Sequence, residues 1–181
     1  MKTFLIGGAR SGKSSLAARW AGERSSDVCC VVTATASDDE MSARIAAHRR
    51  ERPQHWRVRE EPIRLGAALR DESRTKALLL VDCLTLWTSN CLWPPRHATG
   101  TDIDLQADLA GWQAERDAFL ASLRAATNEM IVVSNEVGTG LVPENTAARL
   151  FRDEHGRLNQ MVAAACEEAF LVTAGLALRL K

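Results

Sequence analysis

The sequence of 181 residues lacks net charge and long apolar runs, and each absence excludes a class of function. Lysine plus arginine equals aspartate plus glutamate, at 23 each, so no overall field attracts nucleic acid or anionic lipid. No apolar run approaches the ~20 residues that span a bilayer, and no secretory signal precedes the first apolar segment. We therefore expect a cytoplasmic protein with no membrane span and no nucleic-acid partner.

The sequence also lacks paired cysteines, internal repeats and low-complexity tracts. An odd number of cysteines without a C-x-x-C pair favours reduced, mostly buried thiols over disulfides or a zinc site. The five are Cys29, Cys30, Cys83, Cys91 and Cys166. Because no stretch indicates a domain boundary, we expect a single domain over residues 1–181, long enough for a substantial core.

The most informative stretch fits the phosphate-binding pattern G-x-x-x-x-G-K-[ST]. Its residues are Gly7, Gly8, Ala9, Arg10, Ser11, Gly12, Lys13 and Ser14. A short apolar strand is predicted before it and a helix after it, which is the context that the pattern needs. Glycines let backbone N–H groups point at phosphate oxygens, and the helix N-terminus adds partial positive charge. We expect Lys13 on the β- and γ-phosphates and the Ser14 hydroxyl at a Mg²⁺ position; the alternative is a glycine turn that matches by chance.

Segments of strand type alternate with helical segments along the whole chain. Continuous apolar runs predict buried strands at residues 3–6, 28–33, 77–81 and 130–134, and a closing hairpin around Gly175. Helices are predicted from residue 15, near Ser37, over 65–69, over 105–123 and from about Thr146. This alternation predicts an α/β fold: a P-loop NTPase-like three-layer sandwich with a mostly parallel sheet and a C-terminal edge hairpin.

Two polar groups follow predicted strands at the edge of the sheet where ligands bind in such folds. Asp82 ends an apolar strand, where a P-loop enzyme places the carboxylate that holds Mg²⁺, directly or through water. Alone, Asp82 could equally be a surface aspartate, but beside the phosphate loop we assign it to Mg²⁺ together with Ser14. After the next strand, Asn135 and Glu136 begin a glycine-containing segment that offers polar groups to a substrate or forms only a tight turn.

His48 is the histidine with the most suggestive surroundings. On the apolar face of a predicted helix it would more often be structural than catalytic. Three arginines follow it, Arg49, Arg50 and Arg52, and guanidinium groups bind phosphate well. A neutral imidazole is also a competent nucleophile toward phosphorus, although the arginines could simply form a solvated helix end. The other histidines lie in polar or loop contexts and receive no role; they are His55, His97 and His155.

The sequence resembles the bifunctional adenosylcobinamide kinase / adenosylcobinamide-phosphate guanylyltransferase family of cobalamin biosynthesis. The matching motifs cover nearly the whole chain in order. Besides the phosphate loop they are DDEMSARI at 38–45 with His48 and RP at 52–53, HWR at 55–57, VDCLTLW at 81–87, SNEVG at 134–138, VPEN at 142–145, FRD at 151–153 and GRLNQ at 156–160.

The resemblance implies two reactions on one chain. A nucleoside triphosphate, ATP or GTP, first phosphorylates adenosylcobinamide; GTP then donates GMP to adenosylcobinamide phosphate through a guanylyl-histidine, with Mg²⁺ as cofactor. By position the guanylylated residue is His48, and Ala47 leaves it as the one candidate where some relatives have two adjacent histidines. Relatives of this type assemble as homotrimers. The positions implied to contact nucleotide, besides the phosphate loop, are Val32, Thr33, Ala34, Arg49, Arg50, Glu51, Arg52, Glu60 and Asp82.

Two other functions remain open from the sequence. A plain P-loop kinase of small molecules would use the phosphate loop and Asp82 and leave His48 structural. A nucleotide-gated switch or binding module would only bind or hydrolyse nucleotide, and against it the chain lacks the N-K-x-D motif with which switch GTPases recognise guanine. The three functions differ in whether the α- or the γ-phosphate of the nucleotide is transferred, or whether the nucleotide is only bound or hydrolysed.

Overall fold

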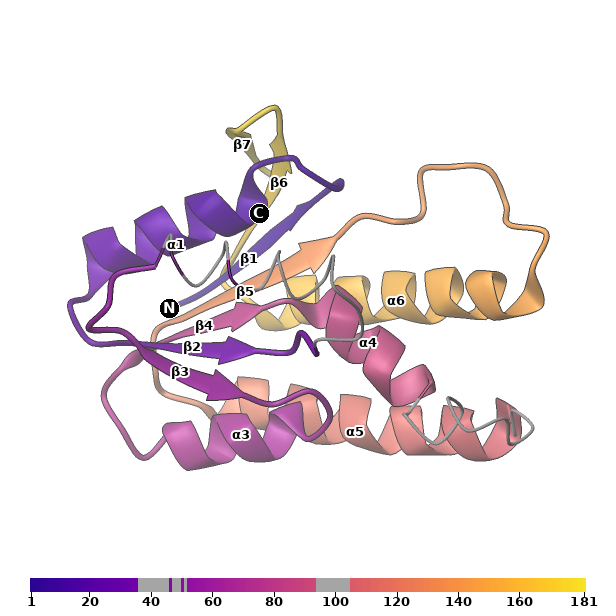
Figure 1. The fold of residues 1–181 in the computed structure, drawn as a ribbon, viewed down its shortest axis with the longest axis horizontal. Coiled ribbons are helices and arrows are strands. Elements are labelled where there is room, and N and C mark those ends of the chain that lie inside the picture. The colour runs from indigo at the N-terminus through magenta and orange to yellow at the C-terminus, as the bar shows by residue number, and fades with distance from the viewer. Residues whose placement is uncertain (36–45, 47–49, 51, 94–104) are drawn as a thin grey trace.

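A seven-stranded sheet forms the centre of the computed structural model, which describes residues 1–35, 46, 50, 52–93 and 105–181 (Figure 1). Its strands are β1 (Lys2–Gly7), β2 (Val28–Val32), β3 (Arg57–Glu60), β4 (Leu78–Asp82), β5 (Met130–Asn135), β6 (Glu168–Thr173) and β7 (Leu176–Arg179). The strand order is β3-β2-β4-β5-β1-β6-β7. Neighbouring strands are parallel except β6 and β7, which form the predicted edge hairpin.

Helices cover both faces of this sheet (Figure 1). They are α1 (Lys13–Arg24), α3 (Leu65–Glu72), α4 (Leu84–Leu92), α5 (Leu105–Ala125) and α6 (Thr146–Ala165). On one face α1 packs through Leu16 and Ala17 in a buried apolar cluster. On the other face α3, α4, α5 and α6 share a larger cluster that contains Trp87, Trp112 and Phe119. The predicted three-layer α/β fold with a mostly parallel sheet is therefore confirmed.

The strands formed by long apolar runs were predicted correctly, and two short elements were missed. The predicted strands correspond to β1, β2, β4, β5 and the β6–β7 hairpin. Strand β3 was missed because its four residues read RVRE, with no apolar run, and it lies at the sheet edge, where charged side chains are tolerated. Helix α4 was missed because it follows the strand almost directly and no side chain caps its start. The helix predicted near Ser37 lies outside the described residues.

The cysteines are free, and four of the five are buried, which confirms the prediction that the thiols are mostly buried. Burial raises the pKa of the Cys30 thiol to about 11, so this group stays protonated near neutral pH and packs as an apolar side chain. Among the helices that the structure describes, none combines the length and apolar character needed to cross a bilayer.

Candidate functional site

The phosphate loop connects β1 to α1 and is shaped by glycines at both ends. Gly12 has φ +90°, a left-handed conformation, and a Cβ there would lie 3.2 Å from Gly175 Cα in the β6–β7 turn. A Cβ on Gly7 would lie 2.3 Å from the Val172 carbonyl oxygen, closer than real contacts allow. At Gly8, in contrast, a Cβ would meet nothing within 4 Å. The loop is thus held against β6 on one side and open at Gly8, where a ligand can approach the backbone.

Lys13 and Ser11 give this loop the polar groups that phosphate requires. The Lys13 ammonium donates a hydrogen bond to the Gly8 carbonyl oxygen at 3.2 Å, which folds the side chain back over the loop. Within the described structure the Ser11 hydroxyl oxygen is buried and has no hydrogen-bond partner. A buried polar atom without a partner costs roughly 1–3 kcal/mol of free energy. A ligand that forms a hydrogen bond with this hydroxyl would remove that cost. The loop fits the phosphate groups of a nucleotide.

Ser14 and Asp82 meet at the start of α1, as the sequence predicted for a Mg²⁺ site. The Ser14 hydroxyl donates a hydrogen bond to Asp82 Oδ1 at 3.2 Å. A hydroxyl and a carboxylate at this distance are oxygen ligands that Mg²⁺ prefers, with water and phosphate completing the shell. The residues fit such an ion. The described residues contain no group of three or more histidine, cysteine or acidic side chains placed to hold a metal.

Arg52 forms an ion pair with Asp82 that the sequence did not predict. Its Nη2 lies 3.5 Å from Asp82 Oδ2, and the two side chains are only 12% and 15% exposed. Arg52 was expected to contact nucleotide, and its place beside the carboxylate puts a guanidinium at the edge of the proposed metal site. Such a group can bind phosphate oxygens bidentately.

The ends of β2 and β3 bring further predicted positions to the same edge. Val32 pairs in register with Glu60 on one side and with Asp82 on the other. Buried Thr33 donates its hydroxyl hydrogen to the Cys83 carbonyl oxygen at 2.6 Å and accepts from the Cys83 N–H at 3.1 Å. Thr33 therefore fastens the end of β2 to the end of β4, a positioning contact for Asp82. Ala34 follows Thr33 and is partly exposed.

A cavity of about 440 Å³ opens beside the Ser14–Asp82 pair, between α1 and residues 52–56. Arg52 and Arg19 line it together with the apolar surfaces of Trp56 and Leu80. Cavities of this size, mostly apolar with a few charged groups, are typical of small-molecule sites. The cavity gives part of a nucleotide or acceptor substrate room next to the phosphate loop.

Several predicted site residues cannot be placed in this geometry. His48, Arg49 and Glu51 lie outside the described residues, so the assignment of the guanylylated histidine stays a prediction. Arg50 is helical and exposed.

His155, which received no role from the sequence because of its polar surroundings, is fully buried in α6. Burial lowers its pKa to about 4, and its ring stacks on Phe151 with centroids 5.4 Å apart. His155 lies within a helix and not in a loop, and its ring nitrogens contact the hydroxyl groups of Thr85, Thr88 and Ser134. The spacing could have shown the helix, because Phe151 lies four residues before His155, and Leu158 and Val162 lie three and seven residues after it, on one helical face.

Comparison with known proteins gives matches over the full length of the chain. Residues 3–180 match the family described as cobinamide kinase / cobinamide phosphate guanyltransferase. The chain is 44% identical over 181 residues to the bifunctional adenosylcobalamin biosynthesis protein CobP of Pseudomonas aeruginosa, covering 100% of this chain and 98% of that protein. It is 38% identical over 182 residues to the bifunctional adenosylcobalamin biosynthesis protein CobU of Escherichia coli K12, covering 100% of both.

Solved structures of low sequence identity share the fold. The chain superposes on a type III secretion system ATPase of pathogenic bacteria with a TM-score of 0.56 at 11% identity, covering 98% of this chain and 56% of that one. The ATPase EscN of enteropathogenic E. coli gives a TM-score of 0.52 at 10% identity, covering 96% and 43%. These likenesses show the α/β fold and nothing more specific.

Proposed function

Because the chain belongs to the cobinamide kinase / cobinamide phosphate guanyltransferase family, we propose that both reactions of that family take place at the carboxyl edge of its sheet. We define this carboxyl edge by the phosphate loop, Asp82 and the ends of β2 and β5. The substrates would be adenosylcobinamide, adenosylcobinamide phosphate and the nucleotides ATP or GTP. The observation that carries the proposal is the Lys13 ammonium folded over the loop next to the Ser14–Asp82 pair.

In the first proposed reaction the site transfers a γ-phosphoryl group to the aminopropanol hydroxyl of adenosylcobinamide. Lys13 neutralises charge on the β- and γ-phosphates, and the loop N–H groups with the α1 N-terminus hold their oxygens. Ser14 and Asp82 would hold Mg²⁺, which would neutralise part of the phosphate charge when bound. Catalysis of this kind depends on positioning and electrostatics more than on a protein base.

In the second proposed reaction His48 attacks the α-phosphorus of GTP and expels pyrophosphate. The adduct is a phosphoramidate, from which GMP passes to adenosylcobinamide phosphate to give adenosylcobinamide-GDP. An ordinary histidine is largely neutral at pH 7 and needs no strong base to prepare it. Arg52, fixed beside Asp82, supports this step because a guanidinium there can stabilise the charge that develops on pyrophosphate.

Denaturing mass spectrometry after incubation with GTP and Mg²⁺ tests this proposal. The wild-type chain should carry GMP through an acid-labile, alkali-stable bond, and the His48→Ala variant should carry none yet still transfer the γ-phosphate of labelled nucleotide to cobinamide. A wild-type chain without an adduct but with γ-transfer would instead be a plain kinase. Nucleotide hydrolysis with neither transfer would indicate a switch or binding module.

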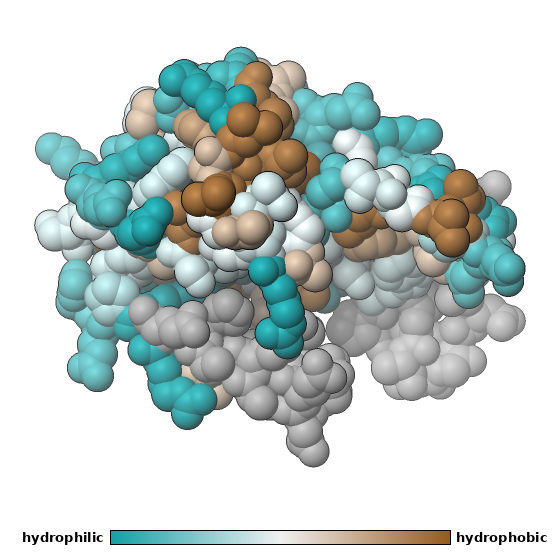
Figure 2. Space-filling model, turned by 90° about the horizontal axis from the view of Figure 1, so that it is seen from above, coloured by the Kyte–Doolittle hydropathy of each residue, from teal (hydrophilic) through white to brown (hydrophobic). Residues whose placement is uncertain are grey.

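We also propose that the chain acts in the cytoplasm as a homotrimer. Exposed apolar side chains on the β6–β7 hairpin support contacts between copies; Leu176, Leu178 and Leu180 are 73%, 60% and 58% exposed. Figure 2 shows apolar surface on the side seen from above. Analytical ultracentrifugation tests the assembly. The molecular mass of the wild type should be three times that of the chain, and the mass of the Leu178→Asp variant should fall toward that of the monomer.

A further inference from the structure

Asn135, at the end of β5, lies between the two parts of the proposed phosphoryl-transfer site. Strand β5 is flanked by β4, which ends in Asp82, and by β1, which ends at Gly7. Asn135 pairs in register with Gly7, and the Glu136 N–H donates to the Gly7 carbonyl oxygen at 3.0 Å. The Lys13 ammonium is bonded at Gly8, one residue further. Asn135 therefore lies on the side of the loop where the terminal phosphate is expected.

The side chain of Asn135 is on the same face of the sheet as the phosphate loop. Successive side chains of a strand point to opposite faces. Ile131 and Val133 pack in the cluster with Leu16 of α1, so Asn135, two residues further, faces the α1 side. Ser134 faces the opposite side, where it bonds to residues of α6. The carboxamide thus faces the loop while the neighbouring hydroxyl anchors the strand from behind.

The Asn135 side-chain oxygen is buried and has no hydrogen-bond partner in the described structure. A carboxamide oxygen only accepts hydrogen bonds, and so do phosphate oxygens at neutral pH. Its missing partner must therefore be a donor. Besides the protein's own groups, the proposed reaction would bring two donors to this place: the hydroxyl of cobinamide that attacks the γ-phosphorus, and a water molecule bound to Mg²⁺. An acceptor fixed at this point suits a hydroxyl that has to be aimed at phosphorus.

The backbone of Asn135 is held from three sides by polar groups of α4 and α6. Its N–H donates to Thr85 Oγ1 at 2.9 Å, and its carbonyl oxygen accepts from Asn159 Nδ2 at 3.1 Å. His155 Nε2 lies 3.1 Å from the same carbonyl oxygen. Because that oxygen can only accept, the neutral ring donates from Nε2. Buried His155 is therefore in contact with the strand end that carries Asn135 and not with the solvent.

We propose that the Asn135 carboxamide oxygen accepts a hydrogen bond from the attacking hydroxyl of cobinamide, and that His155 is a positioning residue that fixes Asn135 for this contact. The inference rests on the kinase half of the proposed function. The hydroxyl oxygen forms a bond to the γ-phosphorus as the bond to the β,γ-bridging oxygen breaks, and the nucleoside diphosphate leaves with that electron pair. The hydroxyl proton passes to an oxygen of the transferred phosphoryl group, because a carboxamide cannot hold it.

The test measures both half-reactions in Asn135 variants of the full chain. With γ-labelled nucleotide, Asn135→Ala should lower kcat of cobinamide phosphorylation about 10- to 100-fold and change the nucleotide KM less than about threefold. Formation of the GMP adduct from α-labelled GTP should stay within about threefold of wild type, as should the Mg²⁺ requirement. Asn135→Ser, which keeps a small polar side chain, repeats the measurement should the alanine variant fold poorly.

Asn128→Ala is the matched control, because Asn128 is also buried and its Oδ1 has no partner among the described residues, but it lies before β5, at the other end of the strand. Its side-chain amide donates to the Thr75 and Ala77 carbonyl oxygens, so its loss should lower thermal stability and leave kcat and KM unchanged. A raised Mg²⁺ requirement in Asn135→Ala would assign the contact to a metal-bound water and overturn the proposal. An equal loss of both half-reactions, or no loss, would overturn it as well.

For His155 the expected signature is coupling to Asn135. His155→Ala should lower kcat of phosphorylation several-fold with little change in nucleotide KM, and His155→Gln, which keeps an N–H donor, should restore most of it. On the Asn135→Ala background His155→Ala should cause no further loss in kcat. Additive losses, or a fall in nucleotide affinity alone, would contradict a positioning role. A wild-type chain that transfers no phosphate to cobinamide would instead refute the proposed function.

Discussion

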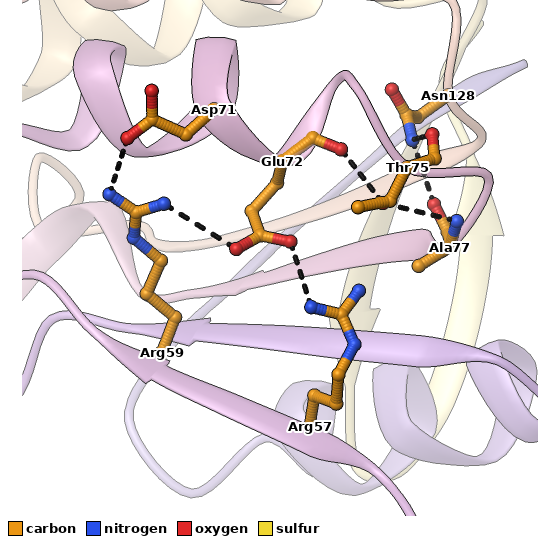
Figure 3. A network of polar contacts seen from close by, with 7 residues as sticks. All are labelled: Arg57, Arg59, Asp71, Glu72, Thr75, Ala77 and Asn128. Carbon is orange, nitrogen blue, oxygen red and sulfur yellow. Dashed lines mark hydrogen bonds and ion pairs between the residues drawn. The ribbon is translucent and has the colours of Figure 1, made fainter.

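Two polar regions of the molecule use the same kinds of side chain in opposite ways. Between β3 and α3, every charge in Figure 3 is met by another: Glu72 lies 3.0 Å from Arg57 and 3.4 Å from Arg59, which also lies 2.9 Å from Asp71. The hydrogen bond from Arg59 lowers the pKa of Asp71. At the carboxyl edge, in contrast, Ser11 Oγ and Asn135 Oδ1 are buried without partners in the described structure.

The difference indicates which region serves the fold and which serves a ligand. The four charged side chains between β3 and α3 pair with one another, need no further molecule and close an exposed sheet edge with charge. Asn128 in the same figure also has a buried Oδ1 without a partner in the described structure, but its amide nitrogen is bonded to the Thr75 and Ala77 carbonyl oxygens. Buried polar atoms without partners cost stability unless something else binds them. The comparison therefore predicts that substitutions between β3 and α3 change stability alone, and that substitutions at the carboxyl edge change activity alone.

The largest expected effect is that of Lys13→Ala. Loss of the ammonium beside the transferring phosphates should lower cobinamide phosphorylation by ~10²-fold or more, while the melting temperature stays close to wild type. Steady-state kinetics with labelled nucleotide and a thermal melt measure the two. Near-wild-type turnover in this variant would show that Lys13 does not contact the transferring phosphates, and it would contradict the comparison.

Asp82→Asn should have the next largest effect, because it keeps the shape of the side chain and removes its charge. Weaker metal binding should raise the Mg²⁺ concentration needed for half-maximal activity about 10- to 100-fold in both reactions. Titration of each reaction with Mg²⁺ measures the change. An unchanged requirement would show that Asp82 does not hold the metal and that its ion pair with Arg52 is structural.

His155 sharpens the comparison, since it is a fully satisfied buried group directly behind the open edge. Its folded pKa of about 4 is below the ordinary value of 6.5, so protonation favours unfolding. The stabilisation is complete above pH ~6.5 and is lost as the pH falls toward 4, by about 2 kcal/mol at pH 5. Denaturant unfolding at pH 7 and pH 5 should show this loss in wild type and not in His155→Gln. The same loss in wild type and the variant would contradict the assignment; replacement of exposed His55 by Gln is the control.

The smallest effect is expected for Glu72→Gln. Its partners are 48% and 27% exposed, so removing the charge should lower the free energy of unfolding by only about 1 kcal/mol. Neither reaction should change in rate, because the network lies apart from the phosphate loop. Urea denaturation and the two activity assays measure this. Loss of activity without loss of stability would show that the network between β3 and α3 serves the reaction and not the fold, which would contradict the comparison.

Much of this contrast could be predicted from the sequence, and its details could not. The phosphate loop, Asp82 and the apolar strands follow local patterns, so their order along the chain was sufficient to predict them. The Arg52–Asp82 ion pair and the contact of Gly175 with the loop depend on which strands become neighbours, which no local pattern states. His155 was misjudged because the polar residues beside it in sequence hid its apolar helical spacing. Strand β3 is too short and too charged to be predicted from its own sequence, without knowledge that it pairs with β2.

Calorimetric titration with GTP in the presence of Mg²⁺ tests the central claim, that the carboxyl edge is the nucleotide site, most directly. The wild-type chain and Glu72→Gln should bind with the same affinity, and Lys13→Ala should bind at least tenfold more weakly, as expected for loss of a charge-assisted contact to phosphate. Equal affinity in all three chains, or weakened binding in Glu72→Gln alone, would show that nucleotide binds elsewhere.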